Sequence, residues 1–153
     1  MVDLFQKKVL MLALYAGEIM MRNGAEIYRV EDTMTHICKA CKMDNVEVFA
    51  TPTGIFISMD RGGDEDDTQT YVKRIKGIST DLRKISQVNH FSRQFSAAAL
   101  SVDEGMTVLK EIDDRGIYPL PVRLLGAAMI SSAFCLIFGG SAADCCISVF
   151  SGI

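Results

Sequence analysis

Lysine and arginine are absent from the chain beyond Arg123, and the only acidic residue in that last stretch is Asp144. All 16 Lys and Arg residues lie at or before Arg123, as do the 19 Asp and Glu residues apart from Asp144. Hydrophobic residues nevertheless make up 49% of the 153 positions, and the mean hydropathy is +0.21. This separation predicts a charged segment followed by an apolar one, which excludes a uniformly soluble domain.

Other features are absent too, and each absence excludes a class of protein. The charges of the first segment nearly balance, so no basic surface argues for nucleic-acid binding. The apolar run Val9–Ala16 is followed by Glu18 and Arg22 instead of a small-residue cleavage site, so it is not a secretory signal peptide. The chain has no nucleophile-elbow motif and no glycine-rich phosphate loop, so nothing in it supports an enzyme.

Cysteine occurs five times, an odd number at irregular spacing that does not fit the disulfide framework of a secreted protein. A reducing cytoplasm fits better. Cys38 and Cys41 have the spacing of a metal-binding or redox pair. A zinc site would need two further ligands, and His36 points away from Cys38 because the two lie two residues apart on one predicted helix. We interpret both cysteines as core residues and predict no metal and no cofactor.

Residues 4–22 and 26–43 are predicted to form two helices. The first has apolar residues at mixed three- and four-residue steps, and Asn23-Gly24 ends it because glycine accepts the left-handed conformation of a C-cap. Its apolar residues are Leu4, Phe5, Val9, Leu12, Tyr15, Ile19 and Met20. The second has a cleaner stripe, at Ile27, Val30, Met34, Ile37 and Cys41. A tight turn between them indicates an αα-hairpin.

The hydrophobic period then changes, and the chain is predicted to form a small sheet of about three strands. Residues 45–60 are rich in β-branched and aromatic residues, and the turn-forming residues Pro52 and Gly54 divide them into a β-hairpin. Residues 68–75 are a predicted third strand. The acidic residues 64–67 lack the ligand spacing of a calcium loop, so we interpret them as a solvated connection.

Two further helices are predicted to complete an α+β domain. One covers residues 80–98, with Ser79 as its N-cap and an inward face made of Leu82, Ile85, Val88, Phe91 and Phe95. The other covers residues 102–115. It opens with a capping box in which Ser101 and Glu104 cap each other's backbone, and Gly116 and Pro119 end it.

Residues 124–143 carry no charge and are predicted to cross a membrane. At 1.5 Å per residue, such a helix spans about 30 Å, the thickness of the hydrocarbon layer. Gly139 and Gly140 break it, and Asp144 begins an incomplete second span, as a helix cap or as part of a polar pathway. We expect a cytoplasmic domain at 1–116, an interfacial linker at 117–123 that ends with Arg123, and a chain that is a piece of a longer protein.

The candidate functional residues are a glycine in the turn before the second helix and the charged residues at the head of that helix. They are Gly24, Glu26, Arg29, Glu31 and Asp32. Two interpretations compete. Glu26 and Arg29 are three residues apart and can form an ion pair, and acidic residues in a first turn favour the helix dipole. Alternatively, this cluster contacts a solute, a proton or another domain.

Several runs of the sequence resemble the bacterial threonine/serine exporter family. The residues that carry the resemblance are Ala16–Met59, which include NGAEIYRVEDTM and the TPTG turn, then Ser101–Asp113, Tyr118-Pro119, and the FGGS that follows the apolar span. The resemblance implies a cytoplasmic domain before several membrane helices, in a cell (inner) membrane. It also implies a role for Gly24, Ala25, Glu26, Arg29 and Glu31.

The function implied by this resemblance is export of small polar metabolites, either threonine and serine or dicarboxylates such as succinate. We expect proton motive force to drive the export. The expected partners are membrane lipid, further membrane helices or a small membrane subunit, the polar solute, and other copies of the chain. Two alternatives remain: a membrane-anchored regulatory module for a separate pore, and a membrane-bound hydrolase.

Overall fold

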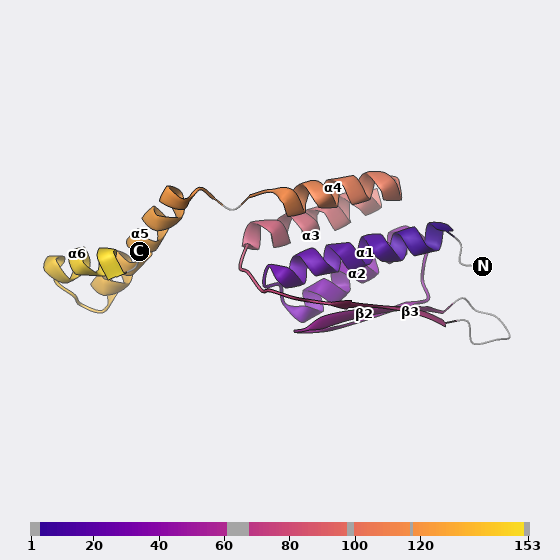
Figure 1. Ribbon diagram of the computed structural model, residues 1–153, viewed down its shortest axis with the longest axis horizontal. Coiled ribbons are helices and arrows are strands. Elements are labelled where there is room, and N and C mark those ends of the chain that lie inside the picture. Colours follow the sequence, from indigo (N-terminus) through magenta and orange to yellow (C-terminus); the bar gives the residue numbers. More distant parts are fainter. Residues whose placement is uncertain (1–3, 61–67, 98–99, 117, 152–153) are drawn as a thin grey trace. The chain divides into compact units, whose positions relative to one another are not determined.

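The computed structural model describes residues 4–60, 68–97, 100–116 and 118–151. The chain forms two compact units, one ending at Arg115 and one beginning at Gly116 (Figure 1). The predicted acidic connection at 64–67 lies outside the described residues.

The first unit has the predicted α+β composition. It contains helices α1 (Leu4–Arg22), α2 (Ile27–Ala40), α3 (Leu82–Ala97) and α4 (Val102–Asp114), with strands β1 (Val46–Thr51), β2 (Gly54–Asp60) and β3 (Thr68–Arg74). The strands form an antiparallel sheet in the order β1-β2-β3. Helices α1 and α2 lie between this sheet and the pair α3 and α4 (Figure 1).

Helix α1 is the centre of this unit, and its position explains its irregular apolar pattern. Ten of its 19 residues are buried, from Val9 to Met21. A helix covered on several sides needs no single apolar stripe. The apolar residues Leu4 and Phe5 are exposed, because the first turn of α1 extends past the core.

The β-hairpin turns at Pro52 and Thr53, as predicted. Opposite Gly54, the Thr51 hydroxyl donates to the Gly54 carbonyl at 3.1 Å. Ile55, Ile57 and Met59 point into the core, and the other face of the sheet carries Phe49, Phe56 and Val72. These three are register neighbours across the strands, so they form one apolar row on an exposed face.

Two helix boundaries in this unit differ from the prediction by two residues or more. Helix α2 ends at Ala40, not at 43, because Lys42 adopts a left-handed conformation with φ 60°. Helix α3 begins at Leu82, which is exposed. Its cap is Asp81, whose carboxylate accepts from the amides of residues 83 and 84. Ser79 was therefore the wrong cap; its own amide donates to the Arg22 carbonyl at 2.7 Å.

The second unit consists of α5 (Leu120–Ile137) and α6 (Ala142–Ser151). Helix α5 begins four residues before the predicted span of 124–143 and ends six before its end. Pro121 favours the early start, because a helix's first turn has no need of that amide. Among the described residues, α5 is the one helix long and apolar enough to cross a membrane, and none of it is buried.

Candidate functional site

Gly24 lies in the turn between α1 and α2, and the structure gives it a backbone role. Its φ is +86°, and the amides of Gly24 and Ala25 donate to the carbonyls of Met21 and Met20. This pattern is a Schellman C-cap. A Cβ on Gly24 would lie 3.3 Å from the carbonyl oxygen of Ser79, so the crossing chain also requires glycine here.

Glu31 connects the helical layer to the sheet. Its carboxylate accepts a 2.8 Å hydrogen bond from the backbone amide of Ala50 on β1. Because β1 is an edge strand, an amide on its outer side has no ladder partner, and Glu31 supplies one. This half-buried residue therefore has a structural role that sequence reasoning did not identify.

The remaining residues at the head of α2 form an exposed surface. Glu26, Arg29 and Asp32 are all exposed, and the expected ion pair between Glu26 and Arg29 is not formed in the part of the chain that the structure describes. A hydrogen bond to the Glu26 carboxylate instead raises the pKa of the Tyr28 hydroxyl. None of these three residues lines either of the two cavities described below, and their functional role stays a prediction.

Cys38 and Cys41 occupy different environments at the end of α2. Burial raises the pKa of the Cys38 thiol to about 12, with a smaller contribution from Cys41, and burial also raises the pKa of Cys41. His36 points elsewhere: its Nε2 lies 2.8 Å from the Ser96 hydroxyl. Across the described ranges, no three His, Cys, Asp or Glu residues come together in a group that could hold a metal ion.

Asp113 has contacts with three side chains of the α+β unit, and the sequence prediction did not include it. The Tyr15 hydroxyl donates to its carboxylate at 3.0 Å, and Arg22 and Lys84 form ion pairs with it at 3.5 and 3.7 Å. Burial, and then this hydrogen bond, raise the pKa of Tyr15 to about 12. Asp113 thus joins α4 to both α1 and α3.

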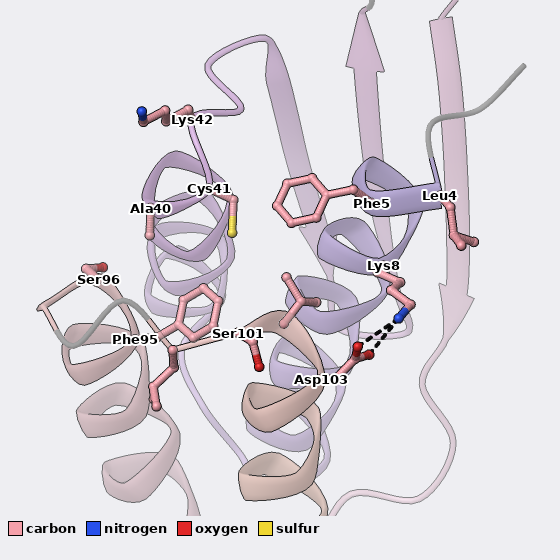
Figure 2. Close-up of a pocket in the computed structure, with 12 residues that line it drawn as sticks. Leu4, Phe5, Lys8, Ala40, Cys41, Lys42, Phe95, Ser96, Ser101 and Asp103 are labelled. Atoms are coloured by element: carbon pink, nitrogen blue, oxygen red, sulfur yellow. Dashed lines mark hydrogen bonds and ion pairs between the residues drawn. The ribbon is translucent and has the colours of Figure 1, made fainter.

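A cavity of about 830 Å³ opens where four helix ends meet. Figure 2 shows Phe5, Cys41 and Phe95 around it, from α1, from the end of α2 and from α3. At its rim Lys8 and Asp103 form an ion pair at 2.8 Å. The walls are largely apolar, and the raised pKa of Cys41 makes its thiol a poor nucleophile at neutral pH.

A second, smaller groove of about 300 Å³ lies between α1, α4 and β3. Glu18 and Lys73 form an ion pair at 2.9 Å beside it, and the glutamate side chain is only 16% exposed. One sequence signal could have located this groove. Residues two positions apart in a strand share a face, so Lys73 is expected on the same face as Tyr71. In the structure this is the half-buried face of β3, where a charge needs a partner.

The predicted membrane-associated residues lie at the ends of the two helices of the second unit. Arg123 is exposed in the first turn of α5. Gly139, with φ +79°, and Gly140 form a Schellman C-cap on the carbonyls of Leu136 and Cys135. Asp144 accepts from the Ser141 amide and hydroxyl, at 2.8 and 2.7 Å, so the two residues form a capping box that begins α6.

The sequence was compared with models of known protein families, and one of them, a family of membrane transporters, matches. The family model ThrE, described as a threonine/serine exporter, matches residues 11–153. No curated protein and no solved structure matches the chain. The family match covers both the α+β unit and the apolar helices. The chain therefore belongs to the threonine/serine exporter family, which is a family of transporters and not of enzymes.

Proposed function

We propose that the protein takes part in the export of small polar metabolites of the threonine and serine type, with dicarboxylates such as succinate as a second solute class. The observation that carries the proposal is the family match over residues 11–153, which includes α5. Apolar side chains such as Leu125, Met129 and Ile137 are exposed around this helix, as lipid contact requires.

The export path needs more helices than α5 alone. A polar solute can cross a bilayer only along a path that several helices enclose, because hydrocarbon offers its polar groups no hydrogen bonds. Small residues of α5, among them Gly126, Ala127 and Ala128, allow close helix packing in lipid. The proposed partners are further membrane helices from a small membrane subunit or from other copies of this chain.

The proposed orientation places the α+β unit in the cytoplasm of a bacterial cell. Lys110, Arg115 and Arg123 lie within the short stretch before or at the start of α5, and positively charged flanks stay on the cytoplasmic side. Export from that side against a gradient needs an energy source. Proton motive force is the source that we propose.

An efflux assay tests this function. Cells that lack their own exporters are preloaded with labelled threonine, serine or succinate, and release is followed with and without the protein and a small membrane partner. We expect faster release of at least one solute, and a protonophore should abolish the acceleration. Unchanged release of all three solutes would contradict the exporter function.

The exposed face of the sheet favours a second candidate, a membrane-anchored regulatory module for a separate pore. Phe49 and Val72 are 63% and 62% exposed, and with Phe56 they offer a partner an apolar row. Replacing all three by serine leaves the inward face of the sheet unchanged. The regulatory candidate predicts two results. A separate pore exports solute without this chain's membrane helices, and the triple variant of the α+β unit abolishes that efflux.

A further inference from the structure

The groove between α1, α4 and β3 combines an apolar floor with charges of both signs. Met11, Leu14 and Met106 line it together with Glu18, Lys73 and Lys110. Its volume of about 300 Å³ is at the lower end of the range for small-molecule sites. A ligand that fits it is therefore small, and part of that ligand is apolar.

The charged groups keep hydrogen-bonding capacity that the protein does not use. Glu18 and Lys73 contact each other at 2.9 Å, but a carboxylate can accept about four hydrogen bonds and an ammonium can donate three. The Lys110 side chain is exposed and has no ion-pair partner among the described residues. The groove thus offers one acceptor group and two donor groups beside an apolar surface.

We propose that this groove binds a small zwitterionic amino acid with an aliphatic side chain. Lys110 and Lys73 bind its carboxylate, Glu18 accepts from its ammonium group, and Met11, Leu14 and Met106 contact its side chain. The two lysines outnumber the single glutamate, so the ligand's carboxylate is the more tightly held group. This site lies in the α+β unit, so binding of the ligand can be measured independently of any transport activity.

The test uses the full chain in detergent, with ¹³C-methyl labels on methionine, titrated with L-valine. Valine should shift the methyl signals of Met11 and Met106 while Met34, which is buried in the core, stays unchanged. Isovalerate lacks the ammonium group and valinol lacks the carboxylate. Each should bind at least about tenfold more weakly than valine, because each leaves a charged group of the groove without its hydrogen bond.

Substitutions identify the residues that bind the ligand. Lys110→Ala should weaken valine binding about tenfold. Lys39→Ala, which removes an exposed lysine of α2, should leave it unchanged. In the unchanged protein, isovalerate should bind better than valinol, because two lysines face its carboxylate. Lys110→Glu should reverse this order, so that valinol binds better than isovalerate. Tighter binding of valinol cannot result from a loss of folding.

Three results would overturn the proposal. The first is no shift of Met11 or Met106 with valine up to about 10 mM, a concentration at which even weak binding is visible. The second is equal binding of valine and isovalerate, which would indicate a simple anion site. The third is an equal effect of Lys110→Ala and Lys39→Ala. Threonine, which has nearly the shape of valine, then tests whether an exported solute also occupies the groove.

Discussion

The carboxylate of Glu31 accepts a hydrogen bond of 2.8 Å from the backbone amide of Ala50, 19 residues further along the chain. This contact satisfies an outward-facing amide of the edge strand β1 and holds it against α2. It also separates Glu31 from its neighbours at the head of α2. Glu26, Arg29 and Asp32 are exposed, whereas Glu31 is half-buried and holds the fold together.

Replacing Glu31 by alanine should destabilise the α+β unit by about 1–3 kcal/mol, because the Ala50 amide loses its acceptor. Glu31→Gln keeps an acceptor oxygen and should cost less. Amide hydrogen exchange of Ala50 measures the effect directly and should become faster in the alanine variant. Glu47→Ala, an exposed glutamate of the same strand, is the control. Equal exchange in the two alanine variants would contradict the structural role of Glu31.

Lys42→Gly should stabilise the protein by about 0.5–1 kcal/mol, because a lysine with φ 60° carries strain that glycine does not. The turn itself remains, since the amides of Lys42 and Met43 donate to the carbonyls of Lys39 and Cys38. Lys39→Gly lies inside the last turn of α2 and should instead destabilise by about 1 kcal/mol. Denaturant unfolding, followed by circular dichroism, measures the unfolding free energy of each variant and so gives the sign of each change.

Gly24→Ala should destabilise more than Gly77→Ala. Both glycines have positive φ, +86° and +71°, so each alanine carries a backbone cost of about 1–2 kcal/mol. Only at Gly24 does the added methyl group meet the chain, 3.3 Å from the Ser79 carbonyl oxygen. The difference between the unfolding free energies of the two variants therefore measures the cost of the contact between the methyl group and the Ser79 carbonyl. Equal losses would show that the crossing segment adjusts freely.

The stability of the α+β unit should fall as the pH rises between about 10, the ordinary pKa of tyrosine, and about 12, the pKa of Tyr15 in the folded chain. In that range the folded state holds a proton that the unfolded state has lost, so rising pH favours unfolding. Asp113→Asn removes the negative charge but keeps an acceptor oxygen, and it should lower the pKa of Tyr15. Ultraviolet titration against a Tyr15→Phe reference isolates this phenol.

Labelling of engineered cysteines tests the orientation of the membrane helix. In a chain whose native cysteines are replaced by alanine, Thr53→Cys lies at the tip of the β-hairpin and Ala143→Cys in the first turn of α6; both positions are exposed. If the α+β unit is cytoplasmic, an impermeant maleimide should label position 143 in spheroplasts, and position 53 only after lysis. The opposite pattern would place the α+β unit outside.

Local signals in the sequence predicted the local structure well. The TPTG turn located the hairpin, and Ser101 with Glu104 formed the expected capping box. Contacts between distant segments had no such signal. Ser79 looked like a helix cap because its type and position fit, but its amide is used by the end of α1, and Asp81 caps α3 instead.

The candidate site shows the same contrast between local signals, which the sequence contains, and contacts between distant segments, which it does not. The run Gly24–Asp32 stood out because its charged residues are adjacent in the sequence, yet the structure spreads them between a turn, a strand contact and an exposed face. Glu18 and Lys73 are 55 positions apart and meet only because the sheet packs against α1. Such a pair depends on tertiary packing, which no short window of the sequence contains.

Asp113 also bears on how the molecule responds to a mechanical load. It lies in the last turn of α4, next to the connection that leads to the second unit. Tyr15, Arg22 and Lys84 hold its side chain from α1 and α3. A pull on that connection is therefore distributed over three helices at once. Unwinding the end of α4 would have to break these contacts first, so α4 acts as an anchor for the chain that follows it.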